Sequence, residues 1–190
     1  MRKINQSSGK LTVRTITYCG LLAAISVVLA RVLSFAPAGN TRWSFDKFPL
    51  FLAGMFFGPL AGGLTGFVAD ATGSMMQYGF NPILCPPAIM FGVAGGIFRH
   101  FIAKRPSVIR LVISYLVPTV LGAVLYQSAA LAWVFSAATF FEAFLTNLGA
   151  RSIQFAIVAT IEILLIHLLL RTKVFNRLGI WPPRKTERKS

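Results

Sequence analysis

The sequence has few charged residues and very little acidic charge. Of its 190 residues only 5 are Asp or Glu, against 19 Lys and Arg, and charged residues make up 13% of the chain while hydrophobic residues make up 55%. In soluble domains about a quarter of the residues are charged. The composition therefore excludes an ordinary soluble domain and predicts a single membrane domain.

Cysteine is also scarce, and the residue sets typical of enzymes are missing. The two cysteines, Cys19 and Cys85, lie in apolar stretches without a second cysteine or a histidine at metal-ligand spacing, which excludes a disulfide framework and a zinc site. There is no Ser/His/Asp set, phosphate-binding loop or metal motif. We expect no metal, no cofactor and no catalytic activity, so any ATPase that powers this protein is another chain.

Six apolar runs separated by turn formers make up most of the chain. A helix that crosses a hydrocarbon core of about 30 Å needs roughly 20 apolar residues. The expected spans are 15–36, 46–57, 60–76, 83–103, 108–137 and 149–170, with a bend at Pro118 and a connection over 139–147. The sequence thus predicts an all-α bundle of six transmembrane helices at 15–170, an N-terminal segment at 1–14 and a basic tail at 171–190.

The positive charge lies in three clusters between the apolar runs. Fifteen of the nineteen Lys and Arg residues fall in the N-terminal segment, in the loop after the fourth run, and in the tail. Short loops rich in Lys and Arg stay in the cytoplasm, and an even number of spans puts all three clusters on that side. We therefore expect both termini to be cytoplasmic. Because these residues do not form one exposed basic face, a nucleic-acid partner is not expected.

Four cations remain at the outer side: Arg31, Arg42, Lys47 and Arg151. We expect Lys47 to be exposed, reaching lipid headgroups or pairing with an acid such as Asp46. Arg31 and Arg151 lie within apolar helical sequence, where a charged group usually faces the bundle interior or a wet cavity. Cations around an outward-facing cavity indicate an anionic ligand.

Two carboxylates lie within predicted spans. Asp70 follows a third-span sequence whose glycines recur every fourth residue, a spacing typical of close helix packing. A carboxylate at this depth pairs with a cation, caps backbone amides or meets a ligand, so ligand contact and internal pairing both stay open for Asp70. Glu162 shares a helix face with Arg151 but lies too far along the axis to pair with it. For Glu162 we expect a structural partner on a neighbouring helix.

Small residues and aromatics form two further patterns. Gly20 and Ala24 form a small-x-x-x-small pair on the first span, which suits either docking of another protein's helix or packing within the bundle. Several aromatics gather at the outer helix ends, where they could form an interfacial belt or stack on a flat ring. These aromatics are Phe35, Trp43, Phe45, Tyr78 and Phe80.

Three segments carry a resemblance to a known family. Residues 31–34 (RVLS), 42–54 (RWSFDKFPLFLAG) and 58–70 (GPLAGGLTGFVAD), with Arg151 and Glu162 in the last span, resemble the substrate-binding S components of energy-coupling factor (ECF) transporters. The folate-specific branch is the most similar. The resemblance covers spans one to four and span six, whereas span five is merely hydrophobic.

This resemblance implies a multi-pass subunit of the bacterial cell membrane that binds a vitamin from outside, under a lid between spans one and two. It implies three partners: the membrane coupling protein EcfT, which Gly20 and Ala24 would meet, and two cytoplasmic ATPase subunits. For folate, the dianionic glutamate tail would meet Arg31, Arg42 or Arg151. The pterin would meet Asp70, with Asn81 and Gln77 next, and would stack on Trp43, Phe45, Tyr78 or Phe80.

Other functions stay open at this point. Where many folate-branch members have YFPGFT, this chain has FNPILC at 80–85, so another water-soluble vitamin such as pantothenate is an alternative cargo. A small membrane enzyme with a lipid substrate is a rival of another class, but the sequence shows no catalytic pair for it.

Overall fold

The computed structural model describes residues 12–32, 34–38, 41–76, 79–104, 107–135 and 139–172, and the remaining parts of the N-terminal segment and tail lie outside these ranges. The described residues form α1 (Val13–Val32), β1 (Phe35–Ala38), β2 (Thr41–Trp43), α2 (Lys47–Phe57), α3 (Pro59–Met75), α4 (Pro86–Lys104), α5 (Val108–Pro118), the π-helix η1 (Thr119–Tyr126), α6 (Gln127–Phe135) and α7 (Phe140–Arg171). Since α5, η1 and α6 follow one another without a break, the bundle has the six helical spans that the sequence predicts.

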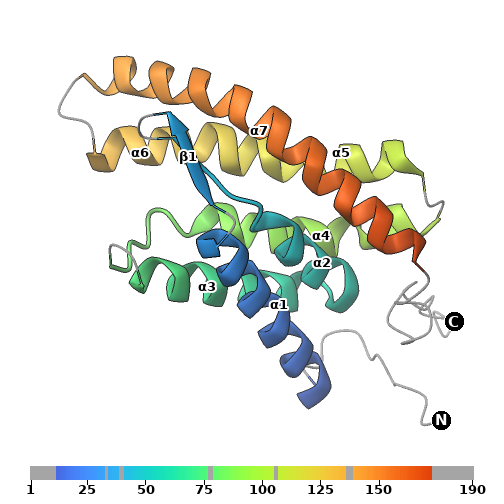
Figure 1. The fold of residues 1–190 in the computed structure, drawn as a ribbon. Helices are drawn as coiled ribbons and strands as arrows, with labels where there is room; N and C mark the ends of the chain where they lie inside the picture. Colours follow the sequence, from blue (N-terminus) through green and yellow to red (C-terminus); the bar gives the residue numbers. More distant parts are fainter. Residues whose placement is uncertain are drawn as a thin grey trace, which may run out of the picture.

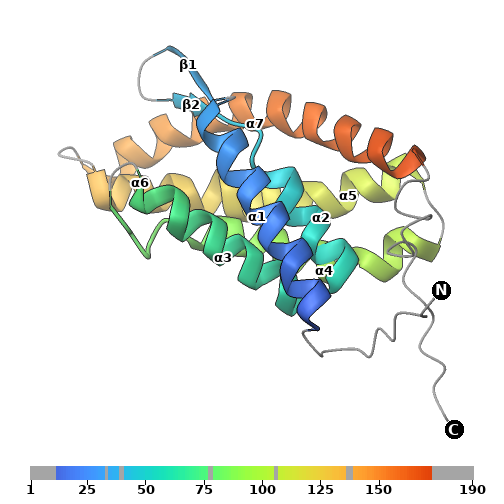
Figure 2. The ribbon, with the colours of Figure 1, turned by 60° about the horizontal axis from the view of Figure 1, so that its bottom comes forward.

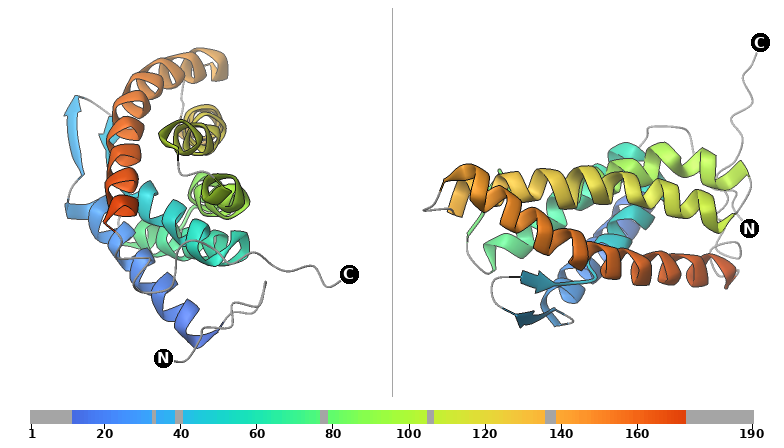
Figure 3. Two further views of the ribbon diagram at one scale, coloured as in Figure 1. Left: turned by 90° about the vertical axis from the view of Figure 1, so that its right-hand side faces the viewer. Right: turned by 90° about the horizontal axis from the view of Figure 1, so that it is seen from above.

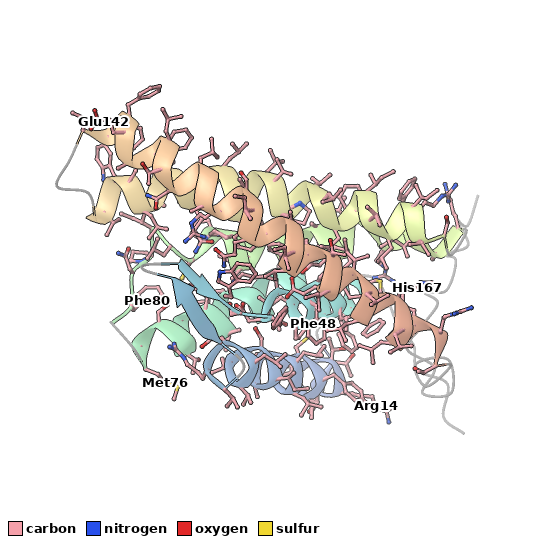
Figure 4. All side chains as sticks on the ribbon, turned by 45° about the horizontal axis from the view of Figure 1, so that its top comes forward. Arg14, Phe48, Met76, Phe80, Glu142 and His167 are labelled. Carbon is pink, nitrogen blue, oxygen red and sulfur yellow. The ribbon has the colours of Figure 1, made fainter. Side chains whose placement is uncertain are left out.

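The helices differ in length, and α2 is much shorter than a full span. Three helices are long and apolar enough to cross a membrane: α1, the continuous helix Val108–Val134, and α7. The 11 residues of α2 extend only about 16 Å at 1.5 Å per residue. Figure 4 places Phe48, at the start of α2, in the middle of the molecule, between Met76, Phe80 and Glu142 at one end and Arg14 and His167 at the other. Thus α2 begins inside the bundle.

The long helices enclose this half-length helix. Figures 1 and 2 show α7 lying across one side of the molecule beside α5 and α6, with α1 and α3 on the opposite side. In both views of Figure 3, α7 separates the β1–β2 hairpin from α5 and α6, and β2 contacts α7. The hairpin thus lies on the outer surface of α7 and leads directly into the loop before α2.

Glycines allow α2, α3 and α4 to cross with their backbones in contact. A Cβ atom added to Gly92 of α4 would fall on the backbone of Gly62 of α3, and one added to Gly54 of α2 would fall on the backbones of Gly92 and Gly96. No side chain larger than hydrogen fits at such a crossing. The glycine spacing seen in the sequence therefore serves internal packing, as predicted.

The hairpin is a structure that the sequence reading did not predict. The first span was expected to run to residue 36, but α1 ends at Val32, and Phe35–Ala38 pairs with Thr41–Trp43 as an antiparallel ribbon. Proline at 37 disfavours helical backbone at the preceding residue, so the apolar run continues as a strand. Hydrophobicity alone could not show this change of conformation.

The start of the last helix was also predicted wrongly. The stretch 139–147 was expected to be a connection, with the span beginning at Gly149, but α7 begins at Phe140. The rings of Phe140 and Phe144 are stacked, with centroids 6.2 Å apart, and an aromatic pair four residues apart supports a helical turn. Gly149 is an interior residue of α7.

Candidate functional site

A cavity of about 310 Å³ lies in the half of the bundle that contains the end of α1, the end of α3 and the beginnings of α2 and α4. This volume is at the lower end of the range of small-molecule sites. Its wall combines apolar side chains with many polar ones. The polar and charged residues that line it are Ser26, Arg31, Ser44, Asp46, Lys47, Asp70, Ser74, Gln127, Arg151 and Gln154.

Three of the residues predicted to bind a ligand come together in this cavity. Arg31 from α1, Asp70 from α3 and Arg151 from α7 all line it. The guanidinium of Arg31 lies beside α3, because a Cβ atom added to Gly73 would be 3.4 Å from its Nη2 atom. Asp70 has a buried Oδ2 atom that receives no hydrogen bond from any residue the structure describes. These positions are the ones a bound ligand could reach.

Other predicted residues lie elsewhere. Phe80 is 41% exposed and contacts Phe67 edge-on, with ring centroids 6.2 Å apart. Asn81 accepts a hydrogen bond from the backbone N–H of Ile83 at 3.1 Å, and so shapes its own turn. Neither of them lines the cavity.

The remaining predicted residues are close to the cavity in sequence or lie beyond the described part. Trp43 and Phe45 are half-buried and flank Ser44, which lines the cavity, but they are not part of its wall themselves. Arg42 belongs to β2, and its side chain lies outside the described residues, as do Gln77 and Tyr78.

Lys47 corrects one expectation. It was expected to be exposed at the outer surface, yet its side chain is only 13% exposed and lines the cavity, with Nζ 2.8 Å from Oδ2 of Asp46. It reaches this depth because α2 begins in the middle of the bundle. The predicted pairing with Asp46 is confirmed, whereas exposure to lipid headgroups is not.

Two further polar residues of the wall, Gln127 and Gln154, were missed from the sequence. Gln154 is buried and follows Arg151 by three residues, so the two share a face of α7. Gln127 is the first residue of α6, directly after the π-helix η1. A polar residue within an apolar span is itself a signal of an inward-facing position, and that signal was available at both sites.

Glu162 lies beside the start of α2 and binds its first backbone N–H groups. Its Oε1 atom accepts hydrogen bonds from the backbone N–H groups of Lys47 at 3.1 Å and Phe48 at 3.2 Å, and its Oε2 atom accepts one from the Tyr115 hydroxyl at 2.6 Å. The expected structural partner on a neighbouring helix is therefore present on both α2 and α5.

Arg151 differs from Lys47 in its surroundings. No residue in the described part of the chain gives Arg151 a hydrogen bond or an ion pair, whereas Lys47 is paired with Asp46. Altogether three cations and two carboxylates line the cavity. The site thus has an excess of positive charge, suited to an anionic group, together with carboxylate and amide groups that can accept N–H donors.

Comparisons with known proteins agree with this architecture. The chain is similar to a solved structure of FolT bound with folic acid, with a TM-score of 0.69 and 25% identity, covering 85% of this chain and 95% of that one. It is also 30% identical over 112 residues to a UPF0397 protein of Streptococcus gordonii, and this match spans 57% of the chain and 58% of that protein.

The family comparison covers most of the chain. Residues 10–171 match the sequence profile described as ECF-type riboflavin transporter, S component. This range includes all the described helices and the whole cavity wall. The chain therefore belongs to the family of S components of ECF-type riboflavin transporters.

Proposed function

We propose that this protein is the substrate-binding S subunit of a vitamin importer of the bacterial cell membrane, and that its cargo is folate. The observation that carries the choice of folate is Arg151, a cavity cation without an acidic partner in the described residues. A guanidinium in such a place favours a ligand that brings its own carboxylate. Folate has two carboxylates in its glutamate tail.

The rest of the cavity suits the other end of the same molecule. Asp70 has an unbonded, buried Oδ2 atom, and a pterin ring offers adjacent N–H donors to a carboxylate. Arg31 lines the same cavity as a second cation. The similarity to FolT bound with folic acid supports the same cargo. Trp43 and Phe45, which flank Ser44 of the cavity wall, remain our candidates for ring stacking.

Riboflavin is the second candidate, because the description of the family names it. Riboflavin carries no carboxylate, so it would leave the charge of Arg151 without a counter-ion. Pantothenate has one carboxylate, so the negative charge it brings to Arg151 is intermediate between that of folate and that of riboflavin. We expect calorimetry on the purified chain in detergent to show tight one-to-one binding of folate and none of riboflavin or pantothenate. Binding of riboflavin without folate would reverse the choice of cargo while leaving the importer role in place.

We further propose that α1 docks a membrane coupling protein of the EcfT type, which works with two cytoplasmic ATPase subunits. Gly20 and Ala24 are exposed on α1, while the buried residues Ala23 and Ser26 lie on its inner side. A Cβ atom at Gly20 would meet nothing within 4 Å. Packing within the described bundle therefore does not account for Gly20, and a shallow surface facing outward suits a partner helix.

A Gly20→Leu substitution tests this surface. We expect it to reduce co-purification of the coupling protein at least tenfold, since a large side chain would hold the two helices apart, while folate binding stays unchanged. The matched control is Gly149→Leu, because Gly149 is also a helical glycine with nothing within 4 Å of an added Cβ. Normal co-purification of the Gly20→Leu protein would contradict the docking proposal.

A further inference from the structure

The first turn of α2 donates two hydrogen bonds to a residue far away in the sequence. A helix leaves its first backbone N–H groups without partners inside the helix. In α2, Pro49 has no N–H, so Lys47 and Phe48 carry the donors of the first turn. Both donate to Oε1 of Glu162, at 3.1 and 3.2 Å, across a separation of 115 and 114 residues. Glu162 thus caps α2 from α7.

Glu162 is itself fixed in this orientation. Its second carboxylate oxygen accepts the hydroxyl hydrogen bond of Tyr115 at 2.6 Å. Glu162 is 1% exposed and Tyr115 is fully buried. Since both oxygens are bonded and water is excluded, the carboxylate has no other way to satisfy its hydrogen bonds in the described structure.

Asp46 precedes the first residue of α2 and would ordinarily be the cap. An Asp at this position accepts a bond from the N–H of the second or third helical residue. In α2 the second helical residue is Phe48 and the third is Pro49, which has no N–H. The Phe48 N–H is therefore the donor that an Asp46 cap would bind. The Asp46 side chain makes no cap bond. Its Oδ1 accepts the hydroxyl of Ser44 at 2.6 Å, and its Oδ2 holds the Lys47 ammonium at 2.8 Å.

This arrangement leaves the Asp46 carboxylate in the cavity wall. Asp46, Lys47 and Ser44 all line the cavity. The backbone carbonyl of Asp46 also accepts the Ser26 hydroxyl at 2.7 Å, which ties the loop to α1. The side chain of Asp46 can face the cavity only while another acceptor binds the backbone N–H of Phe48.

We propose that Glu162 is a positioning residue for the binding site: by capping α2 in place of Asp46, it keeps Asp46 and Lys47 in the cavity wall in ligand-binding geometry. This inference rests on the proposed function, because it is read out through vitamin binding. When Glu162 is removed, we expect the Asp46 side chain, which directly precedes α2, to turn toward the freed Phe48 amide. Lys47 then loses the partner that holds its flexible side chain in place.

A double-mutant cycle on the full chain in detergent tests this, with folate binding measured by calorimetry. Glu162→Ala and Asp46→Ala are each expected to weaken folate binding about tenfold, the scale of one lost hydrogen bond to a charged group. In the double variant we expect about the same tenfold loss as for Asp46→Ala alone, because no carboxylate is left to turn away. Losses that multiply to about 100-fold would overturn the inference, and so would an Asp46→Ala protein with unchanged affinity.

A conservative variant separates positioning from stability. Glu162→Gln keeps an oxygen for the two amides but without the charge, so it competes less well with Asp46 for the Phe48 N–H. We expect it to weaken folate binding about threefold, and not at all in the Asp46→Ala background. The Glu162→Gln variant also replaces Glu162→Ala in the double-mutant cycle if the alanine variant does not fold. A Glu162→Gln protein with a lowered Tm and wild-type affinity would show a merely structural role and overturn the inference.

Ser114→Ala is the control, because Ser114 is buried on the same helix as Tyr115 but its hydroxyl donates to the Arg110 carbonyl and does not bond Glu162. We expect affinity to be unchanged in this variant. The two proposals also fail in different ways. Wild-type protein that does not bind folate contradicts the proposed cargo, and the cycle is then run with riboflavin or pantothenate, whichever of the two binds. Wild-type protein that binds folate, with multiplicative losses in the cycle, contradicts only the role of Glu162.

Discussion

Arg151→Ala is expected to weaken folate binding about 100-fold, equivalent to about 3 kcal/mol, the usual cost of truncating one partner of a buried charge pair. Arg151 lines the cavity, and no residue in the described chain pairs with it, so a ligand carboxylate would be its main partner. Removing the guanidinium leaves that carboxylate desolvated without a donor. Calorimetry on the detergent-purified variant measures the loss, with thermal unfolding as a check that the bundle is intact.

Two variants make this result specific. Arg14→Ala removes the same charge from an exposed position at the opposite end of the bundle (Figure 4), and we expect it to leave folate binding unchanged. Arg151→Lys keeps the charge but loses the planar fork that binds a carboxylate through two hydrogen bonds, so an intermediate loss is expected. If Arg14→Ala weakened binding as much as Arg151→Ala, the effect would be long-range electrostatics. The proposed contact between Arg151 and a ligand carboxylate would then be wrong.

Gly92→Ala is expected to destabilise the bundle by about 3 kcal/mol, at the upper end of the usual cost of overpacking. The added Cβ atom would fall on the backbone of Gly62. A backbone atom cannot rotate away as a side chain can, so α4 would have to move off α3. Thermal unfolding and size-exclusion chromatography in detergent would show a lowered Tm and aggregation.

Gly149→Ala provides the control for this prediction. Gly149 is also a helical glycine, but an added Cβ atom there would have nothing within 4 Å. Replacing a helical glycine by alanine then stabilises by up to about 1 kcal/mol, because alanine loses less conformational freedom on folding. A Gly92→Ala protein as stable as the wild type would show that α3 and α4 do not cross in backbone contact.

The two substitutions act on separate properties. Arg151 lies in the cavity wall, whereas Gly92 lies at the crossing of α3 and α4. We therefore expect Arg151→Ala to lower affinity without lowering Tm, and Gly92→Ala to lower Tm first. This difference tells a binding defect from a folding defect in any assay of uptake.

Local sequence patterns were sufficient for the membrane bundle. Apolar run length, turn formers and the distribution of Lys and Arg predicted six spans, because each depends on the chain's own composition and on the bilayer. The glycines of α3 predicted close packing in the same way, since spacing along one helix decides which residues share a face. We could predict Arg31, Asp70 and Arg151 as site residues because a charged side chain within an apolar span usually faces the bundle interior or a wet cavity.

Local patterns also misled where two conformations compete. Residues 35–38 are apolar enough for a helix but form a strand, and Lys47 was expected to be exposed but lines the cavity. In each case a partner elsewhere in the chain is involved: β2 pairs with the strand, and Glu162 accepts the hydrogen bond of the Lys47 backbone N–H at the start of α2. Hydropathy and spacing do not describe such partners.

The sequence by itself therefore determined that this chain is a six-span membrane protein with charged residues inside its spans, because these properties follow from residue type and order. Only the tertiary structure decided which of those groups share one cavity, that Lys47 lies in its wall rather than in lipid headgroups, and that Glu162 caps α2. The physical reason is that a hydrogen bond between residues 115 positions apart forms only when the packing of the helices brings its donor and acceptor together.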